Sequence, residues 1–213
     1  MSECAAALPL STLLLGRDGL NTGAALALSI AIGYLLGSLP FAYWLARAKG
    51  VDIRKVGTGN PGSANLFRKV SKPLGILALL LDAGKGALSL LVAYWLGLSP
   101  SLEILAGVAA IIGHLHSPFL RFRGGAGLAT IVGIALAASP ISWLAGLAVG
   151  LPYIIIKKNT GWGVGAGLII FITVAALIDV EWQVILAISL MCVALVVRAK
   201  IVEASSPASV RRS

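Results

Sequence analysis

The chain has 213 residues, of which 58% are hydrophobic and only 12% are charged. Soluble domains contain about 45–50% apolar and about 25% charged residues, and no stretch of this chain is polar enough for a water-facing domain. The composition therefore excludes a soluble globular protein and favours one all-α integral membrane domain, a helical bundle. The formal net charge of +9 would suggest nucleic-acid binding in a soluble protein, so the position of the basic residues decides its meaning.

The N-terminal part of the chain contains one weak apolar segment and the first predicted span. Residues 1–23 have no basic residue before their apolar stretch, so we expect a weak interfacial segment rather than a secretory signal. The span over 24–45 is long enough to cross about 30 Å of hydrocarbon. The loop over 47–72 follows with seven basic residues and one acid, and the positive-inside rule therefore predicts that it is cytoplasmic.

Six further spans complete a predicted seven-span membrane domain over 24–202. Their expected bounds are 74–98, 102–120, 127–138, 140–156, 161–178 and 182–197. Pro140 divides the long apolar stretch over 127–156, because this stretch is too long for one crossing and proline interrupts helices. The predicted N-terminus lies outside and the C-terminus inside, where a polar, disordered cytoplasmic tail covers 203–213.

The predicted topology explains the net charge. It places 15 of the 17 basic residues on the inner side of the membrane. The charge is then a signal for orientation and an attraction to anionic lipid headgroups. No nucleic-acid partner is expected.

The first inner loop contains a glycine- and asparagine-rich stretch over 51–68 that is suited to an anion. Glycines let successive backbone N–H groups converge on a phosphate, hydroxyl and amide side chains add donors, and Arg68 can bind phosphate oxygens bidentately. The alternative is a flexible loop in which the Gly–Asn pairs only form turns.

The second inner loop, over 113–127, repeats this chemistry and runs directly into a predicted helix. Free N–H groups at a helix N-terminus favour an anion, and Arg121 and Arg123 add charge. The alternative is a basic turn at the membrane surface with glycines for close helix packing. His114 could donate or carry a proton, or it could be an ordinary interfacial histidine. His114 and His116 have no nearby cysteine or carboxylate, so no metal site is predicted.

Asp82 and Lys85 lie inside the second predicted span, at a depth of about 12 Å if the helix is regular. Residues three apart share a helix face, so the two charges can neutralise each other. Ionisable side chains at such depth indicate function. The alternative is an ion pair that supports the inner loops without touching a substrate.

Four motifs together resemble the bacterial acyl-phosphate:glycerol-3-phosphate acyltransferases, the PlsY family of small seven-span membrane enzymes. The matching segments are 37–41, 52–68, 81–86 and 113–130, in the family's order and spacing. The resemblance implies transfer of a fatty acyl group from acyl phosphate to the sn-1 hydroxyl of glycerol 3-phosphate, giving lysophosphatidic acid for phospholipid biosynthesis. It implies no metal, coenzyme A or other cofactor.

The resemblance also implies surroundings and roles. It implies a multi-pass protein of the bacterial plasma membrane that contacts membrane lipids, has a cytoplasmic active face and receives acyl phosphate from a soluble enzyme that produces it. We predict that the catalytic residues are Thr58, Asn60, Arg68 and His114. The predicted phosphate-binding residues are Gly57, Gly59, Gly62, Ser63, Asn65, Arg121, Arg123, Gly124, Gly125 and Gly127. Asp82 and Lys85 are predicted to support them.

The chain departs from the family pattern at several places. Thr58 stands where the family has serine, and Ala126 stands where the family's Gly-Gly-Lys-Gly loop has lysine. Gly161 and Val164 align with serines of a third motif. The family's C-terminal histidine and asparagine are absent from Arg198 onward.

These departures keep two alternatives open. One is a divergent paralogue that binds a phospholipid, another phosphorylated ligand or a partner enzyme without turnover. The other is a small transporter, since broken helices and charges within the membrane also occur in transporters. In the acyltransferase reading, Arg121 and Arg123 are the candidates to replace the positive charge that Ala126 lacks.

Overall fold

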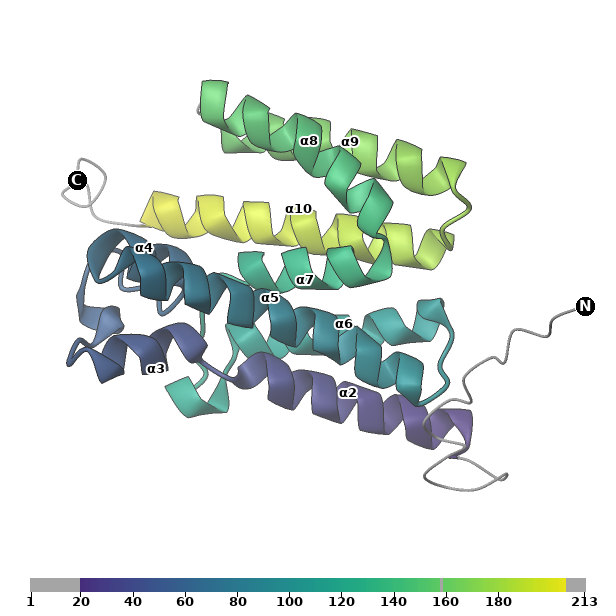
Figure 1. The fold of residues 1–213 in the computed structure, drawn as a ribbon, viewed down its shortest axis with the longest axis horizontal. Coiled ribbons are helices and arrows are strands. Elements are labelled where there is room, and N and C mark those ends of the chain that lie inside the picture. The colour runs from purple at the N-terminus through teal and green to yellow at the C-terminus, as the bar shows by residue number, and fades with distance from the viewer. Residues whose placement is uncertain (1–19, 158, 206–213) are drawn as a thin grey trace, which may run out of the picture.

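The computed structural model describes residues 20–157 and 159–205, which form helices and connecting loops without a strand. The long helices are α2 (Thr22–Ser38), α5 (Lys72–Trp95), α6 (Pro100–Leu115), α7 (Leu128–Ala138), α8 (Pro140–Lys157), α9 (Thr160–Leu177) and α10 (Trp182–Ser205). The short ones are α3 (Phe41–Ala48), η1 (Ile53–Lys55), α4 (Ser63–Lys69) and η2 (Pro118–Leu120). The long helices run side by side, with α3, α4 and the C-terminal end of α10 at one end of the bundle (Figure 1).

The predicted helical membrane bundle is confirmed. Within the described ranges, four segments are long and apolar enough to cross a membrane: Thr22–Ala48, Lys72–Trp95, Pro100–Leu120 and Pro140–Lys157. Three shorter apolar helices follow the remaining predicted spans: Leu128–Ala138, Gly161–Leu177 and Trp182–Arg198. The predicted division of the long apolar stretch before Pro140 is also confirmed, since α7 ends at Ala138 and α8 begins at Pro140.

The first span differs from the predicted continuous helix. Leu39 has extended backbone, with ψ 116°, and separates α2 from α3. The cause is Pro40, because the ring of a proline disfavours helical backbone in the residue before it. The carbonyl oxygen of Leu39 accepts a hydrogen bond from Nζ of Lys85 at 2.8 Å, so a side chain of α5 satisfies the interrupted backbone.

Three other boundaries differ from the sequence prediction. Helix α6 ends at Leu115 rather than at residue 120, because the chain turns into η2 at Pro118. Helix α10 continues to Ser205 and so includes the first residues of the predicted tail. The tail over 206–213 and residues 1–19 of the predicted interfacial segment lie outside the described residues.

Small residues allow the helices to approach closely. A Cβ on Gly37 would collide with the backbone of Ala110, which joins α2 to α6, and a Cβ on Gly133 would collide with the backbone of Ala83, which joins α7 to α5. Such contacts are typical of membrane proteins, where apolar side chains gain no hydrophobic energy by leaving the lipid and backbone packing replaces it.

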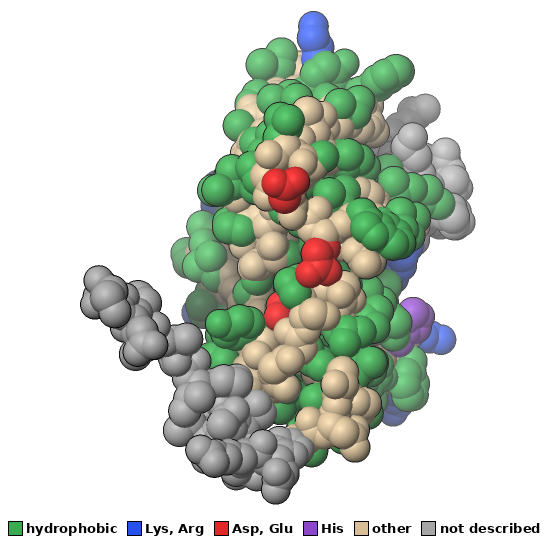
Figure 2. Space-filling model, turned by 90° about the vertical axis from the view of Figure 1, so that its right-hand side faces the viewer, with side chains coloured by type: hydrophobic (Ala, Val, Ile, Leu, Met, Phe, Trp, Pro, Cys, Tyr) green, Lys and Arg blue, Asp and Glu red, His purple; other side chains and the backbone are tan. Residues whose placement is uncertain are grey.

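The two ends of the bundle carry different charges. Glu103 lies in the first turn of α6, and Asp179 and Glu181 lie in the connection between α9 and α10. Figure 2 looks onto the end opposite α3 and α4 and shows acidic side chains there, with Lys and Arg only toward the margins. The basic loop over 47–72 contains α4 and lies at the other end (Figure 1). This asymmetry fits the charge rule by which the loops were predicted to be cytoplasmic.

We expect the Gly133→Ala substitution to lower the free energy of unfolding by about 1–3 kcal/mol, because the added methyl group meets rigid backbone of α5. Thermal unfolding in detergent measures the effect. Gly84→Ala is the matched control, since nothing lies within 4 Å of a Cβ built there and alanine favours helix. Equal stability of the two variants would contradict the close approach of α5 and α7.

Candidate active site

Asn65 holds the first glycine-rich loop onto α4. Its buried amide nitrogen lies 3.0–3.2 Å from three carbonyl oxygens, those of Ile53, Val56 and Asn60. Its side-chain oxygen accepts a hydrogen bond from the backbone N–H of Thr58 at 3.2 Å. One amide side chain thus pairs with both donors and acceptors of the loop backbone and fixes the loop's shape.

The N–H groups from Thr58 to Asn60 bond within the protein, which differs from the expectation that they converge on a ligand. The N–H of Gly59 donates to the carbonyl of Val56 at 3.0 Å, and the N–H of Asn60 lies 3.4 Å from the hydroxyl of Thr58. The buried Oδ1 of Asn60 has no hydrogen-bond partner in the described part of the chain. The loop therefore presents hydroxyl and amide side chains to a ligand.

The second glycine-rich loop is partly strained. Arg121 and Phe122 have φ values of 54° and 62°, a left-handed conformation that costs a residue with a side chain about 1–3 kcal/mol. The N–H of Phe122 donates to the carbonyl of Ser117 at 2.8 Å, which helps to hold this conformation. Strain of this kind is common at binding sites, and Arg121 and Arg123 are both exposed on this turn.

The loop ends at the N-terminus of α7. Gly124 and Gly125 donate their N–H groups to the carbonyls at the end of α6, at 2.9 and 3.1 Å. Gly127 precedes α7 with φ 88° and makes no side-chain cap. The first N–H groups of a helix have no acceptor within the helix, so the start of α7 is suited to an anion.

Two cavities lie between these loops. The larger has a volume of about 700 Å³ and is lined by Asp52, Arg54, Lys55, Thr58, Gly59, Asn60, Pro61, Leu120, Arg121, Arg123, Gly124 and Arg198. The smaller has a volume of about 60 Å³ and is lined by Thr58, Asn60, Gly62, Ser63, Ala64, Asn65, Arg68, Asp82, His114, Ala126, Gly127, Leu128 and Ala129. Thr58 and Asn60 belong to both linings, so the two cavities adjoin at these side chains.

The larger cavity is strongly cationic. Its lining contains three arginines besides Arg54, one lysine and a single acid, Asp52. Asp52 pairs with Arg54 at 2.9 Å, and the hydrogen bond from this guanidinium lowers the pKa of the carboxyl group to about 2. Asp52 therefore stays ionised near neutral pH but compensates only its neighbour. The remaining positive charge favours an anion.

A buried polar cluster lies behind the cavities. Asp82 and Lys85 form the predicted ion pair, with 2.7 Å between their charged atoms, and both are almost inaccessible to solvent. Nδ1 of His114 lies 3.8 Å from Asp82 and 3.3 Å from the hydroxyl of Thr130. His114 also lies directly against Gly125. The cluster connects α5, α6 and α7 beneath the second loop.

The structure brings most of the predicted site residues together. Gly57, Lys85 and Gly125 are the exceptions, since they line neither of the two cavities. Arg54, Lys55 and Arg198 line the larger cavity although the sequence analysis did not select them. Arg54 and Lys55 could have been found as the basic residues of the first motif. Arg198 lies far from both loops in the chain, and by sequence its charge is explained as a signal for membrane orientation.

An apolar groove of about 470 Å³ adjoins the smaller cavity. It is lined by Ser63, Ala64, Phe67, Arg68, Gly75, Ile76 and Leu79, from α4 and α5. Ser63, Ala64 and Arg68 also line the smaller cavity, so a polar and an apolar space meet at Arg68.

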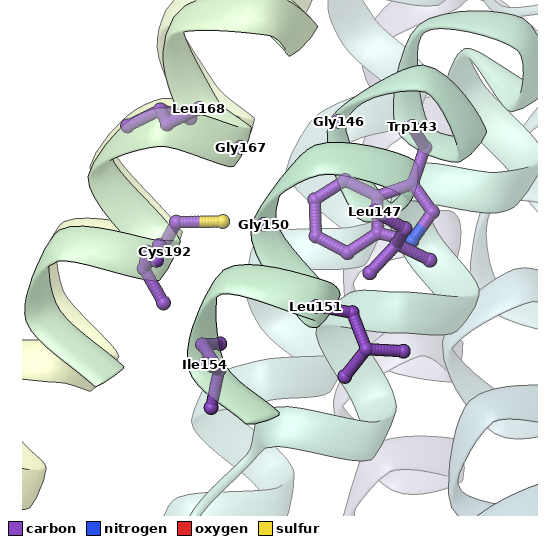
Figure 3. A pocket seen from close by; sticks show the side chains of 11 residues that line it. Trp143, Gly146, Leu147, Gly150, Leu151, Ile154, Gly167, Leu168 and Cys192 are labelled. Carbon is purple, nitrogen blue, oxygen red and sulfur yellow. The ribbon is translucent and has the colours of Figure 1, made fainter. Parts of the chain in front are cut away.

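A second apolar cavity, of about 100 Å³, lies between α8, α9 and α10 (Figure 3). Trp143 and Leu147 of α8 lie across it from Cys192 of α10. Val164, one of the positions where the family has serine, lines this cavity and neither of the two polar ones. In the described structure, α8 and α9 thus contribute nothing to the lining of the polar cavities.

Fold and site together define a multi-pass helical membrane protein. Its candidate site, at one end of the bundle, suits anionic molecules, including those with an apolar chain. The chain belongs to the glycerol-3-phosphate acyltransferase family, because the sequence profile of that family matches residues 27–205.

Curated relatives and solved structures agree with this assignment. Glycerol-3-phosphate acyltransferase 1 of Deinococcus radiodurans is 49% identical over 114 residues, 54% of this chain and 58% of the relative. The Zymomonas mobilis glycerol-3-phosphate acyltransferase is 40% identical over 151 residues, 67% of this chain and 70% of the relative. The chain spans about three fifths of the length of the first curated relatives it matches.

The structural likeness covers more of the chain. The crystal structure of PlsY, an integral membrane glycerol 3-phosphate acyltransferase in its glycerol 3-phosphate form, has a TM-score of 0.72 and 29% identity over 83% of this chain and 90% of that one. The lysophosphatidic acid form gives a TM-score of 0.70.

We expect Asn65→Ala to lower the free energy of unfolding by about 2–4 kcal/mol, because it leaves loop carbonyls buried without a donor. The released loop should also be cleaved faster by trypsin after Arg54 and Lys55, which limited proteolysis in detergent measures. Asn21→Ala, which removes the cap of α2 at the other end, is the control. Unchanged cleavage of the Asn65 variant would show that another contact holds the loop.

Proposed function

We propose that this chain transfers a fatty acyl group from acyl phosphate to the sn-1 hydroxyl of glycerol 3-phosphate and so makes lysophosphatidic acid for phospholipid biosynthesis. The observation that carries the proposal is the junction of two anion-suited cavities at Thr58 and Asn60, with an apolar groove adjoining one of them. Membership of the family and relatives named glycerol-3-phosphate acyltransferase support it.

The acyl donor has an apolar chain and an anionic phosphate. The apolar groove suits the chain, and the smaller cavity that it meets at Arg68 suits the phosphate. Its chain lies along Phe67, Ile76 and Leu79, which are apolar. Its phosphate lies in the smaller cavity, between Arg68 and the first N–H groups of α7. The donor thus enters from the bilayer and keeps its chain in an apolar environment.

The acceptor is a small polar anion, and the larger cavity suits it. The cationic lining binds its phosphate, and Thr58 and Asn60 lie where its hydroxyl meets the donor. The buried Oδ1 of Asn60 accepts a hydrogen bond from this hydroxyl and orients it. Bringing two anions together in one cationic site offsets their mutual repulsion.

The reaction needs no covalent enzyme intermediate. The acceptor oxygen attacks the acyl carbonyl carbon, the bond from this carbon to the phosphate oxygen breaks, and inorganic phosphate leaves. The proton of the hydroxyl passes to the departing phosphate, so the products are the ester and hydrogen phosphate. His114, buried beside the smaller cavity, holds the second loop in place and is available as a hydrogen-bond donor.

The surroundings follow from the same site. The site lies among the basic loops, which the charge rule assigns to the cytoplasm, and we infer a bacterial plasma membrane with the active face inside. Acyl phosphate must be made from an activated fatty acid, and a soluble enzyme that produces it at this face is the expected supplier.

We expect Arg68→Ala to abolish nearly all product, because it removes the cation at the junction of cavity and groove. The assay uses purified protein in lipid vesicles with palmitoyl phosphate and radiolabelled glycerol 3-phosphate, and the product is labelled lysophosphatidic acid. Lys69→Ala, one residue further along α4, is the control. No product from the parent above protein-free vesicles would refute acyl transfer, and label accumulating inside sealed vesicles would indicate transport instead.

We expect Leu79→Trp to shorten the preferred acyl chain, because the indole fills the groove. The rate with palmitoyl phosphate should fall at least fivefold relative to that with octanoyl phosphate. Leu80→Trp adds the same ring to an adjacent, exposed residue that does not line the groove. A preference that is unchanged in the Leu79 variant would place the chain elsewhere, for example in the cavity of Figure 3.

A further inference from the structure

The glycine-rich loop over 124–127 contains no charged side chain, and only Gly124 of this loop lines the larger cavity. A phosphate in the larger cavity therefore needs its cations from elsewhere. Four other cations line this cavity, and all are exposed: Arg54, which is paired with Asp52, Lys55, and Arg121 and Arg123 on the turn after α6. Exposed cations are well hydrated and screened by salt, so each contributes less than a half-buried cation in the same cavity.

Arg198 is placed differently. It comes from α10, far along the chain, and its Nη1 donates a hydrogen bond to the carbonyl oxygen of Gly125 at 3.0 Å. It is half-buried and lines the larger cavity together with Thr58 and Asn60. A guanidinium group has five N–H donors in a rigid fork, so the bond to Gly125 fixes its orientation and leaves donors for an anion.

The packing of α10 aims this side chain at the loop. Leu195, three residues earlier and on the same helix face, is buried, and its Cδ2 lies 3.2 Å from a Cβ built on Gly127. The contact sets the position of α10 against the start of α7. Arg198 therefore reaches the loop from a fixed point, and less conformational entropy is lost when it binds a ligand.

We propose that Arg198 binds the phosphate of the water-soluble acceptor in the larger cavity and is the cation of the glycine-rich loop in this chain. The inference rests on the proposed function for the identity of the acceptor, glycerol 3-phosphate. It assigns the two phosphates to different arginines: Arg68 to the acyl phosphate and Arg198 to the acceptor. The two ligands then meet at Thr58 and Asn60.

Two substitutions separate the charge of Arg198 from its hydrogen bond to the loop. Arg198→Gln keeps a donor for the carbonyl of Gly125 but removes the charge, whereas Arg198→Lys keeps the charge. With full-length protein in phosphatidylcholine vesicles, the glutamine variant should raise the KM for glycerol 3-phosphate at least tenfold and that for palmitoyl phosphate less than twofold. The lysine variant should stay within about threefold of the parent for both substrates.

Lys157→Gln is the matched control, because it removes one exposed charge at the end of α8 and because Lys157 lines neither polar cavity. It should leave both KM values unchanged. An unchanged KM for glycerol 3-phosphate in the Arg198→Gln variant would overturn the proposal while acyl transfer stands. An equal rise of both KM values in the glutamine and lysine variants would also overturn it, since Arg198 would then only anchor the loop.

Direct binding distinguishes failure of this proposal from failure of the proposed function. If the parent makes no product, its thermal unfolding midpoint with and without glycerol 3-phosphate is compared with that of Arg198→Gln. A shift in the parent that is lost in the variant supports the phosphate site without turnover. An equal shift of the midpoint in both proteins overturns the proposal. It is also overturned if phosphatidic acid vesicles, but not glycerol 3-phosphate, shift the midpoint of the parent more than that of the variant.

Discussion

The buried ion pair between Asp82 and Lys85 lies where the elements around the site meet. Lys85 bonds to the carbonyl of Leu39 at the break between α2 and α3, and Asp82 lies near His114, on which the loop at Gly125 rests. Removing either charge would leave its partner buried and uncompensated, which costs far more than the pair itself contributes. The pair thus ties the interrupted first span, α5 and α6 into one arrangement, and the position of the second glycine-rich loop depends on it.

In both loops, several backbone N–H groups are already bonded within the protein before any ligand arrives. In the first loop, Asn65 and internal turns occupy the N–H groups around Thr58. In the second, Gly124 and Gly125 bond to the end of α6. At the edge of a membrane such pairing is expected, because unsatisfied backbone groups are costly where water is scarce. What remains for ligands is a preorganised set of side chains and the start of α7, which suits the binding of two mobile anions.

Much of the architecture follows from local pattern. Apolar segment lengths and the charge of the loops predicted a helical membrane bundle, and Pro140 predicted the division between α7 and α8. The motifs around Thr58, Arg68 and Gly124 predicted which segments form the candidate site, because glycine, amide and basic residues at short spacing are suited to an anion. The break at Leu39 is also a local effect, of Pro40, but span length concealed it, because a kinked and a straight helix have the same hydropathy.

The sequence by itself thus determined the class of fold, the charged end of the bundle and the segments that line the candidate site. Only the tertiary structure decided which groups face the cavities. Close approach of backbones at glycines such as Gly133 set the helix positions, and these depend on contacts between residues far apart in the chain. For the same reason Arg198, which reaches Gly125 across 73 residues, has no signal in local sequence. Its role depends on the packing of α10 against α7, and no spacing rule describes that contact.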